Sequence, residues 1–492
     1  MTILDLFDAA LADRAGHLAV DGATYDDLHA GALRVAGLLE DAGLRPGDRL
    51  ALYVENRIGF VYAYLAALRL GVVAVPVNVL YRSSDLAHVL DDAGAAAVVT
   101  SAGTHAHVAA LPWSPPAIDV DAIEACARDA AQPALAPAPA PGPADVAVVL
   151  YTSGTTGRSK GAMLTHGNLA AIAAQIVVAW RWSAADSLLV ALPLFHMHGL
   201  GAALNGTLAA GGRLTVHQRF DAARVLGELR SGEYTMFFGV PTMYVRMLET
   251  AGDEPVPPLR LYVSGSAALS PAVHAAFGAR FGAEILERLG ATEFGFALTN
   301  RYGGPRVAGS VGVPPPGTAV AIVAPGTVDP VAAGDTGELL VSGPTVFAGY
   351  WNQPDATHAA FATTSDGTRW YRSGDLARYS AEEGVYRIVG RLKELIISGG
   401  FNVYPREVEL EIERDETVRA CAVVGVADAA RGELPVAFVE AGAAFDEAAL
   451  LARLRERLAS FKVPKAVYVV EALPRNALGK VEKQRLAPPG GA

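Results

Sequence analysis

A buried strand that runs directly into a loop of glycine and hydroxyl residues constrains this chain more than any other feature. The apolar run 146–150 is typical of a strand covered on both faces. The segment 151–161 that follows (Tyr-Thr-Ser-Gly-Thr-Thr-Gly-Arg-Ser-Lys-Gly) combines glycines, hydroxyl groups and one lysine. Glycines let backbone N–H groups converge on an anion, and hydroxyl and ammonium groups add donors. The segment therefore predicts a polyphosphate-binding loop; the alternative is a polar surface turn.

This loop is not a Walker A loop, because Gly-Lys-Ser/Thr is absent at the required spacing. Around it, helical and strand-like patterns alternate over residues 1–132, for example a helix at 62–70 followed by a buried strand at 72–77. Such alternation predicts parallel α/β layers. The proline-rich stretch 133–143 is expected to be an extended surface connector within this domain.

Two later regions have a different character. Residues 334–379 are rich in strands and turns, which indicates a small β subdomain. After about Gly390, the patterns predict a compact α+β unit with helices at 406–414 and 447–458 and strands at 420–426, 435–439 and 467–470. With 492 residues, the chain is long enough for more than one domain. We expect an α/β N-terminal domain, residues 1–390, and a small α+β C-terminal domain, residues 391–492.

Charge and composition exclude several classes of function. The net charge of −11 argues against a general nucleic-acid surface or anionic-membrane surface, so anionic substrates would need locally gathered positive charge. The chain has two cysteines, Cys126 and Cys421, which give no disulfide framework and fit a reducing compartment. No signal peptide and no membrane-spanning run are recognised, so we expect a cytoplasmic protein.

Four separated motifs occur in an order that is specific to one superfamily. They are 151–161, 371–375 (Tyr-Arg-Ser-Gly-Asp), 390–394 (Gly-Arg-Leu-Lys-Glu) and 474–480 (Pro-Arg-Asn-Ala-Leu-Gly-Lys). Over essentially its whole length the chain resembles the adenylate-forming superfamily of acyl-CoA synthetases, nonribosomal adenylation domains and luciferases. The resemblance implies a mobile C-terminal domain and the use of ATP, Mg²⁺ and coenzyme A. A carboxylate and ATP would give acyl-AMP and pyrophosphate, and a thiol would then displace AMP.

The resemblance also implies roles for individual residues. Glu293 would bind Mg²⁺, a task suited to a carboxylate that acts together with phosphate oxygens, and Asp375, assisted by Arg391, would accept hydrogen bonds from the ribose. Taken alone, Glu293 and Asp375 would be read as solvated charges or helix caps. The remaining nucleotide contacts would come from Thr152, Ser153, Gly154, Thr155, Thr156 and Lys160 at the phosphates, Thr292 at the α-phosphate, and Gly265, Ser266, Ala267 and Leu289 at the adenine.

Three further roles concern the catalytic lysine and the thiol. Lys480 would bridge the acyl carboxylate and the α-phosphate, where charge moves in the transition state, with Thr155 and Glu293 as the other catalytic residues. Its alternative is an ordinary exposed lysine after a turn. Lys393 would be the hinge between the two half-reactions. Gly399 and Gly400 would line the path of the pantetheine thiol, because glycine allows a ligand to pass close to the backbone.

The segments 192–200, 238–246 and 263–269, which would form the walls and floor of the acyl pocket, most resemble those of malonyl-CoA synthetases. His196 and His198 lie in one predicted wall of the acyl pocket, and Arg246 and Arg288 match the two arginines that bind the distal carboxylate in that group. A short dicarboxylate needs one carboxylate clamped by cationic donors, and arginine provides a permanently charged fork. The alternatives are an ion pair of Arg246 with Glu249, a salt bridge of Arg288 with Glu287 or another carboxylate, and a core role for His198.

Two departures leave the acid open. The family usually has an adenine-stacking aromatic residue where this chain has Leu289, and Phe294-Gly295 replaces a small polar run. Phe294 and Phe296 would either narrow the acyl pocket or belong to the core. Methylmalonate, a longer diacid and a monocarboxylic acid (aliphatic or aromatic) remain open, as does a carrier protein in place of coenzyme A. A nucleotide sensor without catalysis is the alternative of another class. We expect no nucleic-acid or membrane partner, and the sequence does not assign an oligomeric state.

Overall fold

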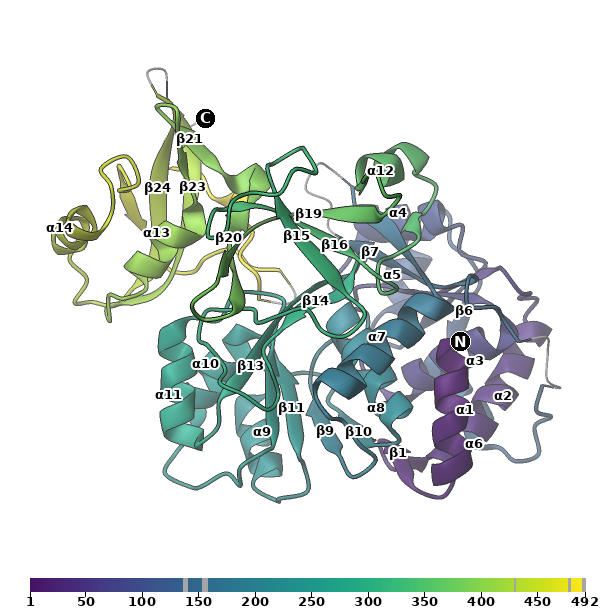
Figure 1. Ribbon diagram of the computed structural model, residues 1–492. Helices are drawn as coiled ribbons and strands as arrows, with labels where there is room; N and C mark the ends of the chain where they lie inside the picture. Colours follow the sequence, from purple (N-terminus) through teal and green to yellow (C-terminus); the bar gives the residue numbers. More distant parts are fainter. Residues whose placement is uncertain (136–139, 153–157, 429–430, 477–478, 489–492) are drawn as a thin grey trace.

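Two mainly parallel sheets form the large N-terminal part of the molecule (Figure 1). The computed structural model describes residues 1–135, 140–152, 158–428, 431–476 and 479–488. Within these residues the first sheet has the strand order β14-β13-β12-β11-β9-β10-β1-β2, and the second has the order β17-β8-β7-β4-β3-β5-β6. The predicted parallel α/β layers are therefore confirmed.

The strands of the first sheet are β1 (Leu18–Val20), β2 (Ala23–Thr24), β9 (Ser187–Val190), β10 (Arg213–Val216), β11 (Met236–Gly239), β12 (Leu261–Ser264), β13 (Ile285–Ala291) and β14 (Gly295–Thr299). Those of the second are β3 (Arg49–Tyr53), β4 (Val73–Pro76), β5 (Ala97–Thr100), β6 (Ala117–Asp119), β7 (Val146–Thr152), β8 (Lys160–Thr165) and β17 (Gly349–Tyr350). The predicted buried strands at 72–77 and 146–150 are thus β4 and β7.

The helices of this part are α1 (Ile3–Arg14), α2 (Tyr25–Asp41), α3 (Ile58–Leu70), α4 (Ser83–Ala93), α5 (His105–Ala109), α6 (Val120–Arg128), α7 (His166–Ala179), the π-helix η1 (His198–Leu204), α8 (Asn205–Ala210), α9 (Ala222–Leu229), α10 (Pro241–Thr250) and α11 (Pro271–Phe281). The described residues of the proline-rich stretch 133–143 contain no helix or strand.

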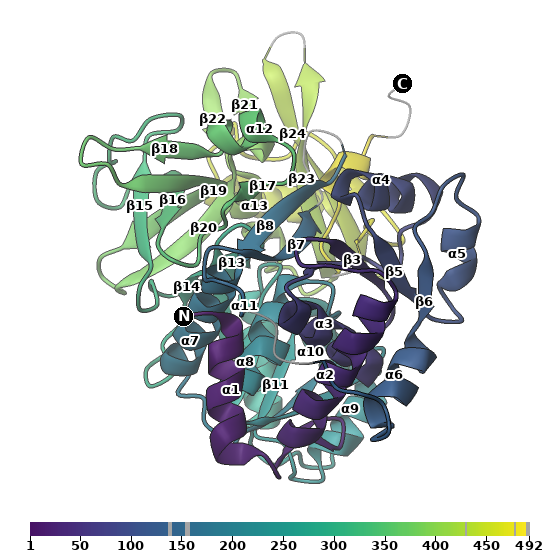
Figure 2. The same ribbon diagram turned by 90° about the vertical axis from the view of Figure 1, so that its right-hand side faces the viewer.

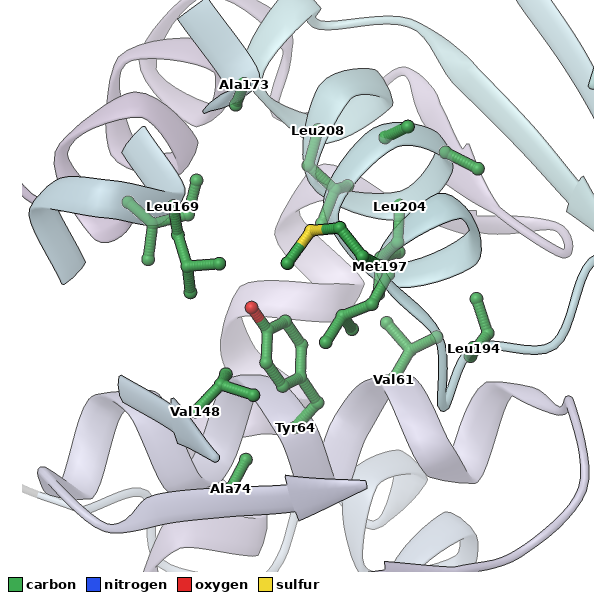
Figure 3. Close-up of a cluster of buried hydrophobic side chains, with 14 of the residues drawn as sticks. Val61, Tyr64, Ala74, Val148, Leu169, Ala173, Leu194, Met197, Leu204 and Leu208 are labelled. Carbon is green, nitrogen blue, oxygen red and sulfur yellow. The ribbon is translucent and has the colours of Figure 1, made fainter. Parts of the chain in front are cut away.

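The largest hydrophobic core lies between the two sheets and includes residues of α3, α7, η1 and α8. Figure 3 shows one cluster of this core, in which Tyr64 of α3 and Met197 beside η1 lie among leucines of α7 and α8. A second cluster, on the other face of the first sheet, packs α9, α10 and α11 against it. The ends of the central strands of the first sheet therefore lie between two packed layers, which positions the site described below.

The described residues also form two smaller sheets (Figure 2). One contains β15 (Ala319–Val323), β16 (Gly337–Ser342), β18 (Phe361–Thr363), β19 (Arg369–Ser380) and β20 (Val385–Arg391), and α12 (Pro354–Ala359) lies between its strands in sequence. The predicted β subdomain at 334–379 is confirmed, but it extends from β15 to β20, because both strands pair with its predicted members.

The other small sheet forms the C-terminal α+β unit. Its elements are β21 (Ile396–Ser398), β22 (Phe401–Val403), α13 (Pro405–Ile412), β23 (Val418–Asp428), β24 (Gly432–Ala441), α14 (Glu447–Arg457) and β25 (Val467–Val469), flanked by the 3-10 helices η2 (Leu392–Glu394) and η3 (Lys483–Arg485). The predicted fold class is correct. Among the described residues, no helix combines the length and the apolar character needed to cross a membrane.

Candidate active site

The end of β7 and the start of β8 bring Thr152 and Lys160 together, because the two residues are partners in the antiparallel β7–β8 register. The Oγ1 of Thr152 donates to Oε1 of Glu293 at 3.3 Å. The Nζ of Lys160 lies 5.2 Å from the ring centroid of Tyr350 in β17. The predicted phosphate residues Ser153, Gly154, Thr155 and Thr156 lie outside the described residues. Hydroxyl, ammonium and carboxylate groups therefore meet beside the predicted phosphate loop.

Glu293 lies in the turn between β13 and β14, next to Thr292. Its carboxylate accepts hydrogen bonds from the hydroxyls of Thr152 and Tyr350, both at 3.3 Å. Burial raises the pKa of Glu293. The described residues contain no group of three or more protein ligands for a metal ion. One carboxylate nevertheless fits Mg²⁺, which is commonly held by one or two carboxylates together with substrate phosphates.

Asp375 and Arg391 face each other across the antiparallel pair β19–β20. The Nε of Arg391 lies 2.7 Å from Oδ1 of Asp375, whose side chain is only 4% exposed. The second oxygen, Oδ2, is buried without a hydrogen-bond partner among the described residues. A buried acceptor without a partner is costly, so this oxygen is free to receive a hydroxyl group of a ligand. The ribose contact of Asp375 stays a prediction.

Lys480 approaches this pair from the C-terminal unit. Its backbone N–H donates to the side-chain oxygen of Asn476 at 3.0 Å, which fixes the local turn. Lys480 is exposed, and partial desolvation by the surrounding protein lowers its pKa; the positive charge of Arg391 lowers it further, whereas Asp375 opposes the shift. A Cβ added to Gly479 would lie 2.7 Å from Oγ1 of Thr242 in α10, so the lysine turn packs directly on the N-terminal part.

The predicted adenine loop follows β12 and has an unusual backbone. Ser266 has φ = 70°, in the left-handed region that non-glycine residues rarely adopt. Strain of this kind is concentrated at functional sites, which supports a binding role for the loop. Leu289, on β13, packs against the central core. Ala267 is partly buried in the same loop.

The predicted acyl residues Arg288 and His198 lie in the interior between the two sheets, 7% and 3% exposed. The guanidinium of Arg288 lies 4.7 Å from the ring centroid of Phe296 and fills the space beside Gly265, where an added Cβ would be 2.4 Å away. Within the described part of the chain, Arg288 has no ion pair, its Nε has no hydrogen-bond partner, and neither ring nitrogen of His198 has one. Among the described residues, the site thus holds a buried cation without an ion pair and a buried imidazole without a hydrogen-bond partner.

Aromatic rings connect these two side chains. His198 stacks on Phe238 at 6.0 Å, and Trp180 contacts both Phe238 and Phe296 edge-on. Burial and the charge of Arg288 hold the pKa of His198 well below its usual range, so the imidazole is neutral near pH 7. Burial also lowers the pKa of His196 to about 4. Burial lowers the pKa of Arg288 to about 9, which leaves the guanidinium charged at neutral pH.

The two predicted arginines occupy different environments. Arg246 is exposed on α10, one helical turn after Thr242 and therefore on the helix face that meets the turn of Lys480. Neither alternative ion pair forms between described residues: Arg246 does not pair with Glu249, and Arg288 does not pair with its neighbour Glu287. Adjacent strand residues point to opposite faces, which separates Glu287 from Arg288. The distal-carboxylate role of both arginines remains a prediction.

The predicted hinge and thiol path lie at the start of the C-terminal unit. Lys393 is exposed within η2. Gly399 and Gly400 are exposed and have φ = 59° and 82°, as the tight β21–β22 turn requires. Phe294 packs 5.8 Å from the ring of Tyr371, in the core, while Phe296 lines the arginine pocket.

Two residues of the site were not expected from the sequence. Tyr350 contacts Glu293 and Lys160, and Glu287 accepts the backbone N–H groups of Leu269 and Gly309 at 3.4 and 3.0 Å. No local pattern marks either residue, because their partners are distant in sequence. A cavity of about 520 Å³ beside Tyr350 and Arg369 contains none of the predicted acyl residues. Cavity size alone therefore does not locate the acyl site.

Comparison with known proteins identifies the architecture. A family described as "AMP-binding enzyme" matches residues 7–351, and its C-terminal domain matches residues 407–480. The chain is 38% identical to feruloyl-CoA synthase from an Amycolatopsis species, over 94% of this chain and 92% of that protein. It is 34% identical to the mitochondrial malonate–CoA ligase of Mus musculus, over 97% of this chain and 88% of that protein.

A solved structure covers almost the whole molecule. The crystal structure of ATP-bound MatB from Rhodopseudomonas palustris superimposes with a TM-score of 0.89 at 38% sequence identity. The match covers 98% of both chains. The similarity therefore includes the N-terminal part and the C-terminal unit together.

Proposed function

This chain belongs to the AMP-binding enzyme family, and from that premise we propose that it joins malonate, or a closely related short dicarboxylate, to coenzyme A through an acyl-AMP intermediate. It is an acid–thiol ligase of the AMP-forming type, as its relatives are. Its cosubstrates are ATP and coenzyme A, and its metal ion is Mg²⁺. The acid is the part of the proposal that depends on this chain's own pocket.

The observation that carries the choice of acid is that, among the described residues, the buried Arg288 has no ion pair and the nearby His198 has no hydrogen-bond partner at either ring nitrogen. A distal carboxylate would give the guanidinium a charge-assisted partner and would accept a hydrogen bond from the neutral imidazole. A fatty or aromatic acid would leave both groups desolvated without partners, which costs several kcal/mol. Such a pocket should reject monocarboxylic acids by large factors. Arg246, exposed beside the lysine turn, is proposed as a second, weaker contact.

In the first half-reaction, Lys160 and the phosphate loop would neutralise the departing pyrophosphate, while Glu293 would hold the Mg²⁺ that screens the phosphate charges. The free oxygen of Asp375 would accept the ribose hydroxyls. Lys480, held near Asp375 by its turn, would place its ammonium between the reacting carboxylate and the α-phosphate. Lys160, the metal ion held by Glu293, and Lys480 would thus stabilise the negative charge that moves from the carboxylate to the departing pyrophosphate.

In the second half-reaction a thiol would displace AMP. We propose that residues 391–492 form the mobile C-terminal domain, that it turns about Lys393, and that Gly399 and Gly400 then line the thiol path. Coenzyme A and the pantetheine arm of a carrier protein present the same thiol. The similarity to CoA ligases supports coenzyme A as the acceptor.

A panel of acids tests this proposal. The purified protein is incubated with ATP, Mg²⁺, coenzyme A and one acid at a time, and thioester products are identified by mass. We expect malonyl-CoA, with methylmalonate next and with butyrate, benzoate and ferulate far behind. Ferulate is included because feruloyl-CoA synthase is among the relatives. Faster thioester formation from ferulate or butyrate than from malonate would contradict the dicarboxylate assignment.

A further inference from the structure

Tyr350 contacts the predicted metal carboxylate and the predicted phosphate lysine at the same time. In the antiparallel β8–β17 pair, Tyr350 is opposite Ala162, so Lys160, two residues earlier, lies on the same face as its diagonal neighbour. The ammonium of Lys160 lies 5.2 Å from the centroid of the Tyr350 ring, within cation–π range. The Tyr350 ring therefore stabilises the position of the Lys160 ammonium group.

The hydroxyl of Tyr350 has a second task. It donates to Oε1 of Glu293 at 3.3 Å, and Thr152 donates to the same oxygen at the same distance. Two donors on one carboxylate oxygen fix the rotation of the carboxylate and leave Oε2 to other partners. The ring itself is held by an edge-on contact with Phe347 at 4.9 Å.

We propose that Tyr350 is a positioning residue for the ATP-consuming half-reaction, with its ring seating Lys160 and its hydroxyl orienting Glu293. The inference rests on the proposed function in that ATP and a divalent metal ion bind here. Outer partners of metal-binding carboxylates commonly set the metal affinity. One side chain then links the cation that contacts the phosphate tail to the carboxylate that holds the metal ion.

The two tasks are separable by substitution. Tyr350→Phe keeps the ring and removes the hydroxyl, whereas Tyr350→Leu removes both. Tyr379→Phe is the matched control, because Tyr379 lies in β19 and contacts the ring of Tyr386 in a tilted arrangement and neither Lys160 nor Glu293. Each variant is measured by calorimetry for ATP binding without divalent metal, and by electron paramagnetic resonance for Mn²⁺ binding with a non-hydrolysable ATP analogue. Neither readout requires turnover.

Tyr350→Phe should bind metal-free ATP like the unchanged protein but bind Mn²⁺ roughly 10-fold more weakly. Tyr350→Leu should weaken Mn²⁺ binding similarly and also weaken metal-free ATP binding by roughly 3- to 20-fold. Unchanged Mn²⁺ affinity in Tyr350→Phe, or equal loss of metal-free ATP binding in both variants, would overturn the inference. Absence of ATP binding by the unchanged protein would overturn the proposed function, and this inference with it.

Discussion

Replacing Arg288 with methionine should convert malonate from the preferred acid to a poor one while making the free protein more stable. Arg288 is buried without an ion pair among the described residues, and burial lowers its pKa from 12.5 to about 9. That shift corresponds to a cost of charging on the order of 5 kcal/mol. A bound distal carboxylate would recover most of this cost, because it supplies the missing opposite charge.

The expected loss of activity follows from the free energy that the bound distal carboxylate recovers. Losing one partner of a buried charge pair typically costs about 3–5 kcal/mol, so kcat/KM for malonate should fall by about 10²- to 10⁴-fold in Arg288→Met. Butyrate has no distal charge, so its kcat/KM should stay the same or rise. Without substrate, the variant loses an uncompensated buried cation and should unfold at a higher temperature.

Pyrophosphate release with each acid measures the first effect, and thermal denaturation without ligand measures the second. Arg219→Met, at an exposed arginine after β10, is the control and should change neither. Equal losses for malonate and butyrate, or a lower denaturation temperature in Arg288→Met, would refute the reasoning. Either result would mean that Arg288 supports the fold and does not recognise a distal anion.

Three other predictions address the remaining groups. Lys480→Ala should lower acyl-AMP formation by about 10²- to 10³-fold, because the lysine ammonium acts on the α-phosphate, and should spare thioester formation from supplied acyl-AMP. Rapid-quench assays of each half-reaction check this, and comparable losses in both would contradict it. Arg246→Ala should lower kcat/KM for malonate by no more than about 10-fold, because an exposed ion pair contributes little, and should leave kcat/KM for butyrate unchanged. Steady-state pyrophosphate release measures both values, and a loss as large as that of Arg288→Met would be contrary evidence. Burial raises the pKa of Glu287 from the ordinary value near 4.5 to about 7. Between these pH values the folded protein retains a proton that the unfolded chain releases. The Glu287 carboxyl therefore lowers the stability of the fold progressively as pH rises from about 4.5 to 7. Glu287→Gln should flatten that part of the dependence of the denaturation midpoint on pH, and parallel curves for the two proteins would exclude the assignment.

The sequence predicted the layers of the fold because its periodic patterns are local. The strands at 72–77 and 146–150 and the C-terminal elements appear where apolar periodicity and turn residues placed them. The extent of the β subdomain was underestimated, because β15 and β20 are recognised only through pairing with distant strands.

Site residues could be predicted from the sequence where they belong to a motif, and less well where only the packing of distant segments brings them together. Asp375 and Arg391, which come from two separate motifs, form an ion pair, while their predicted role at the ribose stays a prediction. The environments of Arg246 and Arg288 differ because one lies on an outer helix and the other on an inward-facing strand position. Tyr350 was missed because its contacts with Lys160 and Glu293 arise from strand pairing between segments far apart in the chain.

The most direct test of the account is exchange of labelled pyrophosphate into ATP, measured with Mg²⁺ and malonate in the absence of any thiol. This assay reports acyl-AMP formation alone, so the choice of acid is separated from the choice of thiol. We predict rapid exchange with malonate, and exchange with butyrate, benzoate or ferulate at least about 100-fold slower, because these acids leave Arg288 unpaired. Exchange driven by a monocarboxylic acid and not by malonate would contradict the central claim.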